Sequence, residues 1–217
     1  MNRPPGPRWR GQQRRIGLTG GIASGKSSVG QWLASQGLPL LDADVVAREA
    51  LAAGSDAAQA VLDHFGERVR AAGSDPGAAA LDRGALGRIV FGDVGERRWL
   101  EQLVHPLVRQ RFDAELQRLA AEPVVVLIIP LLFETGLEEL CSEVWLVDCT
   151  EVQQLQRLMA RDGLSEADGR ARMAAQWPME QKRSRADVVL DNSATLAETE
   201  AHLRLLLPRE ASNDPHP

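Results

Sequence analysis

A short glycine-rich segment contains the residues best suited to chemistry. Positions 20–27 read Gly-Gly-Ile-Ala-Ser-Gly-Lys-Ser, which matches G-x-x-x-x-G-K-[ST] between an expected strand and an expected helix. Glycine lets successive backbone N–H groups converge on phosphate oxygens, and the start of the helix adds a partial positive charge. Lys26 would reach toward the β and γ phosphates, and the Ser27 hydroxyl would ligate Mg²⁺. The residues expected to contact ATP in this loop are Gly20, Gly21, Ile22, Ala23, Ser24, Gly25, Lys26, Ser27 and Ser28.

Lysine is rare in this chain, so its positions are informative. Of the 25 basic residues, Lys26 and Lys182 are lysines and the others are arginines. A glycine-rich turn that ends in Gly-Lys-Ser by coincidence is the alternative interpretation, and the scarcity of lysine argues against it. A dinucleotide-binding fingerprint is excluded because G-x-G-x-x-G does not occur.

Other classes of phosphate-loop protein fit the sequence less well. Lys182 follows Gln181, so the Asn-Lys-x-Asp guanine reader of GTPases is absent, as is the Ser-Gly-Gly signature of transport ATPases. A small-molecule kinase remains, and it needs a carboxylate near the acceptor hydroxyl, Mg²⁺ and arginines. The alternatives left open are a kinase for another small molecule, such as shikimate or a nucleoside monophosphate, and an ATP-dependent switch protein without chemistry.

Two acidic residues follow the second expected strand. Asp42 and Asp44 come after an apolar stretch at 38–41, at the sheet edge where ligands bind in open α/β proteins. Residues two apart on an extended segment point the same way, so both carboxylates would face the phosphate loop. We expect Asp44 to accept the proton of the acceptor hydroxyl. Asp42 would bind substrate or cap a helix that begins near Val45.

Further charged residues lie in the second half of the chain. Asp148 ends an expected strand and resembles a magnesium ligand, but a structural role as the cap of a helix near Glu151 is favoured. Arg157 and Arg161 are one helical turn apart and share a face, from which they would contact ATP. The alternative is that both are simply solvated.

The apolar pattern predicts the elements that position these residues. Expected strands at 16–19, 38–41, 124–129, 144–147 and 188–190 alternate with segments of helical period, which predicts a five-stranded parallel sheet with helices on both faces. Pro106 should bend or split the helix whose apolar stripe covers 100–108. The fold class is therefore α/β, of the phosphate-loop NTPase type, with a helical insertion and a helical lid.

The uneven spacing of the strands predicts the domain organisation. About eighty residues separate the second and third strands, more than one crossover helix needs. We expect a single kinase unit over 15–207, with disordered segments at 1–14 and 208–217. Within the unit, a core would comprise 15–44, 122–160 and 186–207, a helical acceptor domain 45–121, and a lid 161–185.

Composition limits the partners and the compartment. The 217 residues are 44% hydrophobic, without an apolar run near the roughly 18 residues that cross a bilayer, and the net charge is -5. These values argue against nucleic-acid and membrane partners. Cys141 and Cys149 are too few for a disulfide framework, so we expect buried thiols in the cytoplasm. A monomer or a small homo-oligomer is expected.

The motifs taken together resemble the dephospho-coenzyme A kinase family. The resemblance rests on Leu18-Thr19-Gly20-Gly21-Ile22 through Lys26-Ser27, Asp42-Ala43-Asp44 with Val46-Ala47-Arg48, His105-Pro106, Pro130-Leu131-Leu132-Phe133-Glu134, Arg157-Leu158-Met159-Ala160-Arg161, Ala174-Ala175-Gln176 and Ala186-Asp187-Val188-Val189-Leu190-Asp191-Asn192. It implies Mg²⁺-assisted transfer of phosphate from ATP to the ribose 3′-hydroxyl of dephospho-CoA, the last step of coenzyme A synthesis.

The resemblance also implies roles for individual residues. Asp44 would activate the 3′-hydroxyl, Arg161 would contact phosphate and Asn192 would lie near the adenine. The residues implied on the acceptor side are Asp42, Arg48, His105 and Glu134. Alternatively, His105 belongs to a His-Pro turn and Glu134 caps a strand end.

Two residues of the loop depart from the family pattern. Ala23 replaces a common glycine, and Ser28 replaces a common threonine. We expect Ala23 in a right-handed or extended conformation, because alanine costs about 1–2 kcal/mol in the left-handed region.

Overall fold

The computed structural model describes residues 7–73 and 79–207, which form two compact units. One unit combines residues 1–40 with 124–217, and the other comprises residues 41–123. The expected disordered tail at 208–217 and the first six residues lie outside the described residues.

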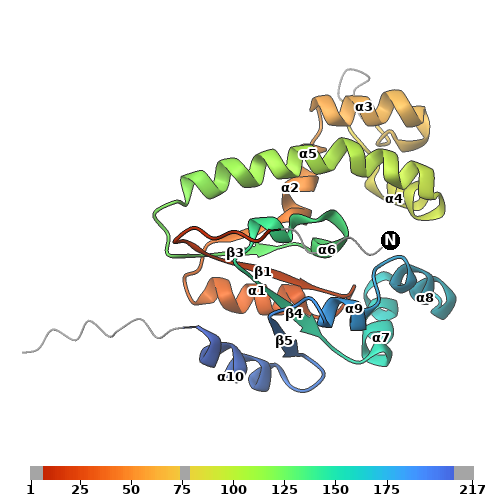
Figure 1. Ribbon diagram of the computed structural model, residues 1–217. Helices are drawn as coiled ribbons and strands as arrows, with labels where there is room; N and C mark the ends of the chain where they lie inside the picture. The colour runs from red at the N-terminus through yellow and green to blue at the C-terminus, as the bar shows by residue number, and fades with distance from the viewer. Residues whose placement is uncertain (1–6, 74–78, 208–217) are drawn as a thin grey trace, which may run out of the picture. The chain divides into compact units, whose positions relative to one another are not determined.

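The described part of the chain contains one five-stranded sheet (Figure 1). Its strand order is β2-β3-β1-β4-β5, and the pairs β1–β3, β1–β4 and β4–β5 are parallel, as the apolar runs predict. Leu18 pairs with Ile128 on one side and with Trp145 on the other. The strands are β1 (Arg14–Gly20), β2 (Leu40–Asp42), β3 (Val124–Ile128), β4 (Glu143–Asp148) and β5 (Val188–Asp191).

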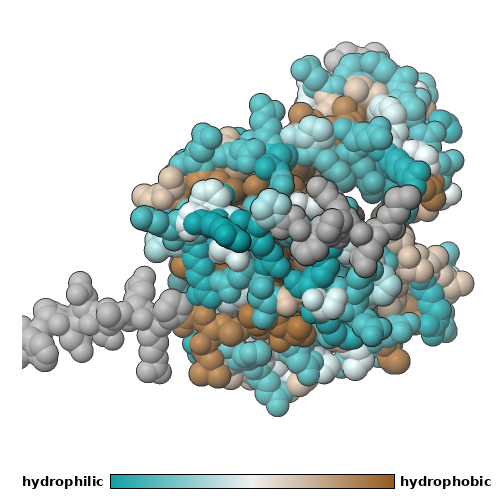
Figure 2. Space-filling model, in the orientation of Figure 1, coloured by the Kyte–Doolittle hydropathy of each residue, from teal (hydrophilic) through white to brown (hydrophobic). Residues whose placement is uncertain are grey.

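Helices of the first unit cover both faces of its strands (Figure 1). On one face, α1 (Lys26–Ser35) and α10 (Leu196–Leu206) bury Trp32 and Leu203 against the strands, and Figure 2 shows apolar side chains gathered on the surface over these helices. On the other face lie α6 (Leu132–Thr135) and the 3₁₀ helix η2 (Leu137–Leu140). Nearly continuous burial of β1, β3 and β4 follows from this double cover.

Three helices follow β4, namely α7 (Glu151–Asp162), α8 (Glu166–Ala174) and α9 (Met179–Arg183). We keep the name lid for residues 161–185, which begin at the end of α7 and contain α8 and α9. Thr150 and Gln153 form a capping box at the start of α7, so the prediction that Asp148 caps this helix is wrong. The helix ends at Gly163, which adopts the left-handed conformation with φ 65°.

The second unit is helical and has a core of its own. Apolar residues of α3 and α4, including Val61, Phe65 and Val90, pack together with partly buried residues of α5. His64 stacks on Trp99 at a centroid distance of 3.9 Å. The elements are α2 (Ala43–Ala50), α3 (Asp56–Phe65), η1 (Gly66–Val69), α4 (Arg83–Gly92) and α5 (Val94–Arg118).

Helix α5 runs through Pro106 as one helix of 25 residues, so the expected split is wrong. Proline removes one N–H donor and its ring crowds the carbonyl of the preceding turn, yet the helix continues on both sides of it. Val104, Val108, Phe112 and Leu116 recur every four residues on the buried side of the helix. Trp99, Leu100 and Leu103, before the proline, pack on the core of the second unit, and buried residues continue along the helix after Pro106.

The expected disorder of residues 1–14 is wrong for residues 7–14, the last of which begins β1. The backbone N–H of Trp9 donates to the carbonyl of Cys141 at 3.0 Å, and the guanidinium of Arg15 lies 3.5 Å from the centre of the Trp9 ring. Arg8 forms an ion pair with Asp187 just before β5. An aromatic ring and an ion pair thus fix a segment that looks featureless in sequence.

Of the described helices, none is long and apolar enough to span a membrane.

Candidate active site

The phosphate loop lies between β1 and α1, as its motif requires. Gly25 caps α1 with φ 100°, a backbone conformation that residues other than glycine rarely adopt. A Cβ at this position would lie 1.9 Å from Nδ2 of Asn192. Lys26 folds back over the loop and its Nζ donates to the carbonyls of Gly20 at 3.0 Å and Gly21 at 2.7 Å. The ammonium therefore lies against the loop in which phosphate oxygens would be bound.

Ala23 adopts the left-handed conformation, with φ 58°, so the expectation for this residue is wrong. It is the one non-glycine residue with positive φ in the described part of the chain. The Ser24 N–H donates to the carbonyl of Gly21 at 3.2 Å, and this tight turn sets the backbone of Ala23. Ser24 is buried, and its hydroxyl has no hydrogen-bond partner among the described residues. The loop thus carries local strain of about 1–2 kcal/mol.

Residues after β5 support the loop. Nδ2 of Asn192 donates to the carbonyl of Ser24 at 2.8 Å, and the Thr199 hydroxyl donates to Oδ1 of Asn192 at 3.3 Å. Nη2 of Arg157 donates to the carbonyl of Asn192 at 3.2 Å. The structure therefore brings two residues expected at the nucleotide, Arg157 and Asn192, to the loop, where the Asn192 side chain is buried beneath it.

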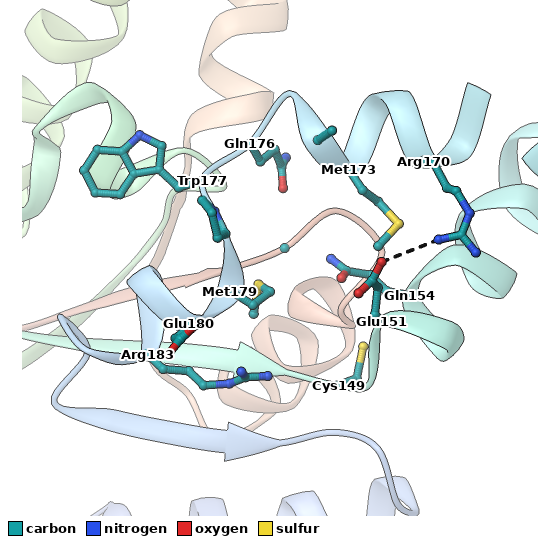
Figure 3. A pocket seen from close by; sticks show the side chains of 13 residues that line it. Cys149, Glu151, Gln154, Arg170, Met173, Gln176, Trp177, Met179, Glu180 and Arg183 are labelled. Carbon is teal, nitrogen blue, oxygen red and sulfur yellow. Dashed lines mark ion pairs between the residues drawn. The ribbon is translucent and has the colours of Figure 1, made fainter. Parts of the chain in front are cut away.

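Residues of α7 and of the lid lie against the loop on another side. Oε1 of Gln176 accepts a hydrogen bond of 2.9 Å from the Ile22 N–H. A Cβ on Gly21 would lie 1.9 Å from Nε2 of Gln154 and 3.0 Å from the sulfur of Met179. A pocket of about 670 Å³ opens here, and its lining includes Gly21, Gln154, Gln176 and Met179 (Figure 3). The pocket therefore begins at the loop and extends under the lid.

Charged residues line the outer part of this pocket. Arg170 lies 3.6 Å from Glu151 in an ion pair, which Figure 3 marks with a dashed line. Cys149 also lines the pocket, and burial raises the pKa of its thiol. Arg183 forms two hydrogen bonds with the carboxylate of Asp148, at 2.6 and 3.1 Å. Asp148 therefore has a structural partner in the lid.

Two buried ion pairs hold the base of the lid. Nζ of Lys182 lies 2.7 Å from Oε1 of Glu134, without hydrogen-bond geometry, and the lysine is fully buried. The same oxygen accepts a hydrogen bond of 3.1 Å from the backbone N–H of Trp177. Arg185 pairs with Glu138 at 2.6 Å. Residues 177–185, the return segment that leads from the lid toward β5, are thereby fastened to α6 and η2.

Arg161 lies near the outer end of α7 and is exposed. It donates two hydrogen bonds to Asp162, at 2.7 and 3.0 Å, and Arg172 contacts the same carboxylate at 2.8 Å. The hydrogen bond from Arg161 and the neighbouring positive charges hold the pKa of Asp162 below its usual value. A pair of arginines on an exposed lid is suited to contact phosphate.

The second unit holds most of the residues expected on the acceptor side. Asp42 has an extended backbone and its Oδ1 accepts the N–H groups of Asp44 at 2.8 Å and Val45 at 3.3 Å, so Asp42 caps α2. Asp44 is exposed in the first helical turn, and Arg48 donates to its carbonyl at 3.0 Å. The expectation that an extended backbone aligns both carboxylates is therefore wrong. His105 is exposed within α5 and does not form a turn.

Comparison with known proteins identifies the family. The family model for dephospho-CoA kinase matches residues 14–198. A dephospho-CoA kinase of Synechococcus sp. (strain CC9605) is 65% identical over 180 residues, which cover 83% of this chain and 85% of the relative. The chain belongs to the dephospho-CoA kinase family. The dephospho-CoA kinase of Prochlorococcus marinus (strain MIT 9313) is 61% identical over 191 residues, 87% of this chain and 93% of the relative.

Solved structures agree with this assignment. A protein from Thermus thermophilus is 39% identical with a TM-score of 0.74, over 90% of this chain and 97% of that one. The dephospho-CoA kinase from Campylobacter jejuni is 27% identical with a TM-score of 0.64, over 88% and 94% of the two chains. The chain is thus a transferase that phosphorylates dephospho-CoA with ATP in the final step of coenzyme A synthesis.

The donors near the loop fit a magnesium ion held mainly by nucleotide phosphates. Ser27 is exposed in the first turn of α1, where its hydroxyl can reach an ion beside the loop. Among the described residues, no group of three His, Cys, Asp or Glu side chains forms a metal cage. Mg²⁺ commonly takes one or two protein oxygens and fills its other positions with phosphate and water.

Three residues beside the loop had no assigned role from sequence: Gln154, Gln176 and Met179. Glutamine and methionine have no charge and are common on helices, so their types alone do not indicate a site. Only Gln176 lies in a stretch that carries the resemblance to dephospho-CoA kinases. Lys182 did stand out by the rarity of lysine, although its partner Glu134 could be found only in the structure.

Proposed function

We propose that the chain transfers the terminal phosphate of ATP to the ribose 3′-hydroxyl of dephospho-CoA with Asp44 as the general base. The observation that carries this proposal is the phosphate loop, where a strand, five loop residues and a helix N-terminus place backbone N–H groups and Lys26 together. Catalysis of phosphoryl transfer consists mainly of positioning and electrostatic stabilisation. Both are what this loop supplies.

On the donor side, we assign the phosphates to the loop residues 20–28. The ammonium of Lys26 would exchange its two carbonyl contacts for phosphate oxygens, which carry more negative charge. Mg²⁺ would neutralise the phosphates beside Ser27. Arg161 would stabilise the transferring group when the lid closes, and Arg157 with Asn192 would line the nucleotide site.

On the acceptor side, we assign the proton of the 3′-hydroxyl to the carboxylate of Asp44. Its neighbour Asp42 caps α2, which fixes the backbone at Asp44. Arg48 and His105 have exposed side chains in the same unit and are proposed to bind the substrate. Glu134 completes this set, and its Oε2 is buried without a hydrogen-bond partner among the described residues.

We further propose that residues 45–121 form the helical acceptor domain and residues 161–185 form the lid. The core would comprise 15–44, 122–160 and 186–207. We place the protein in the cytoplasm as a monomer or small homo-oligomer, without nucleic acid or membrane as partner. Two free, buried cysteines suit a reducing compartment.

A pair of matched substitutions tests the assignment of the base. Asp44→Asn should lower kcat about 10²- to 10⁴-fold with dephospho-CoA and ATP, because the amide cannot accept the hydroxyl proton. Asp42→Asn should leave kcat nearly unchanged, since asparagine caps helices as well as aspartate does. ADP release measures both rates, and circular dichroism checks the fold. Full activity in Asp44→Asn would remove the proposed base, whereas turnover only with shikimate or a nucleoside monophosphate would reassign the substrate.

A further inference from the structure

Gln176 connects the lid to the phosphate loop. Its Oε1 accepts the Ile22 N–H at 2.9 Å, and Figure 3 shows the side chain pointing into the pocket from the segment between α8 and α9. Backbone N–H groups of this loop type bind phosphate oxygens. The side-chain oxygen of Gln176 is therefore hydrogen-bonded to an N–H group of the loop that would otherwise be available to a phosphate oxygen.

The position of Gln176 is fixed by its neighbours in the chain. The next residue, Trp177, donates its N–H to Glu134, and its ring stacks with that of Phe133 at 6.4 Å and 9°. Glu134 is in turn paired with the fully buried Lys182. Anchors on the C-terminal side thus restrict where the backbone can place the Gln176 amide.

Other groups cover the same part of the loop. Gln154 and Met179 lie over Gly21, so closely that a Cβ at Gly21 would collide with the Gln154 amide and crowd the Met179 sulfur. Lys26 donates to two carbonyls of the loop. In this arrangement, the Ile22 N–H and the Lys26 ammonium, which would otherwise bind phosphate, form hydrogen bonds within the protein.

We propose that Gln176 holds the place of a phosphate oxygen, so that ATP must displace its amide from Ile22 when the nucleotide binds. Gln176 is thus a positioning residue that lowers the affinity for ATP and couples occupancy of the loop to movement of the lid. The inference assumes that the loop binds ATP, as the proposed function states. Wild-type ATP binding tests that assumption separately.

Three variants at two glutamines test the proposal. Gln176→Asn shortens the side chain by one methylene, so its amide no longer reaches Ile22, and the Kd for ATP should fall about 2- to 10-fold. Gln176→Glu places a charged acceptor at the same N–H and repels phosphate, so the Kd should rise about 10-fold or more. Gln156→Asn makes the same truncation on the exposed side of α7 and should not alter the Kd. Calorimetric titration with ATP measures each value.

Adenosine and steady-state kinetics separate competition from structural damage. Adenosine lacks phosphates, so its affinity should be equal in wild type and Gln176→Asn. The KM for ATP should fall in Gln176→Asn while the KM for dephospho-CoA and the urea midpoint stay unchanged. Weaker ATP binding in Gln176→Asn would overturn the proposal by making Gln176 a ligand of the nucleotide. An unchanged Kd in both Gln176 variants would also overturn it, because the contact would then be incidental.

Discussion

The ion pair between Lys182 and Glu134 permits a quantitative test of how the base of the lid is held. The two charges are 2.7 Å apart, the Lys182 side chain is fully buried and 15% of the Glu134 side chain is exposed. At an effective dielectric constant of ~20, their attraction is about 6 kcal/mol, and removing two ions from water costs several kcal/mol for each. The pair as a whole should therefore contribute little to stability. Loss of one partner should cost much more, because the other charge stays buried.

We expect Lys182→Met to lower the free energy of unfolding by about 3–5 kcal/mol, and Glu134→Gln to have a similar effect. The double variant should regain most of the loss, since no buried charge remains and the amide carbonyl introduced by Glu134→Gln can still accept the Trp177 N–H. The coupling energy of this cycle should then be about 3 kcal/mol or more. Urea unfolding at 25 °C of the wild type and the three variants gives the cycle.

An exposed ion pair of the same unit provides the control. Arg204 and Glu200 are one helical turn apart on α10 at 3.3 Å, and 61% of the Arg204 side chain is exposed. Their coupling energy should be below about 0.5 kcal/mol. If Lys182 and Glu134 show a coupling as small as this exposed pair, the reasoning about a buried anchor is refuted.

Two further predictions concern strain and burial. Ala23→Gly should stabilise the fold by about 0.5–1 kcal/mol in urea unfolding, because relief of the left-handed alanine exceeds the entropic cost of glycine. Ala34→Gly, at an exposed position of α1, should instead lose about 1 kcal/mol, and equal losses at both sites would contradict the strain. Burial raises the pKa of Cys141 from 9.0 to about 12, so the unfolded thiol ionises first and stability should fall as pH rises from 9 toward 12. Cys141→Ala should lack this part of the decline in urea midpoints measured over that range, and an identical pH dependence would refute the assignment.

The sequence predicts the sheet and the loop well because both depend on local pattern. Apolar runs at successive positions mark strands with cover on both faces, and the five predicted strands overlap those observed. The loop motif carries its own geometry, since glycine spacing and the helix start determine where N–H groups point. The buried, free state of Cys141 and Cys149 was predicted as well, from cysteine number and spacing.

Other features depend on contacts between residues far apart in the chain. Ala23 is left-handed because of a turn that closes three residues apart, and nothing in the residue type alanine indicates it. Helix α5 survives Pro106 because a buried stripe outweighs one lost hydrogen bond. Residues 7–13 are ordered by partners such as Cys141 and Asp187, more than 130 positions away. The conformational propensities of single residues do not include the effects of such contacts.

We expect the two ion pairs at the lid base to act on register more than on stability. Glu134 and Glu138 are four residues apart, whereas Lys182 and Arg185 are three apart, and each acid contacts its own cation. A shift of the return segment by one residue would separate the pairs and bury unpaired charges, which costs far more than a shift between apolar surfaces. Arginine would not replace Lys182 equally, because its five N–H donors require acceptors that a single carboxylate oxygen cannot supply. A compact ammonium in an arginine-rich chain is thus the cation that fits the site, and the fixed register it gives determines where Gln176 meets the phosphate loop.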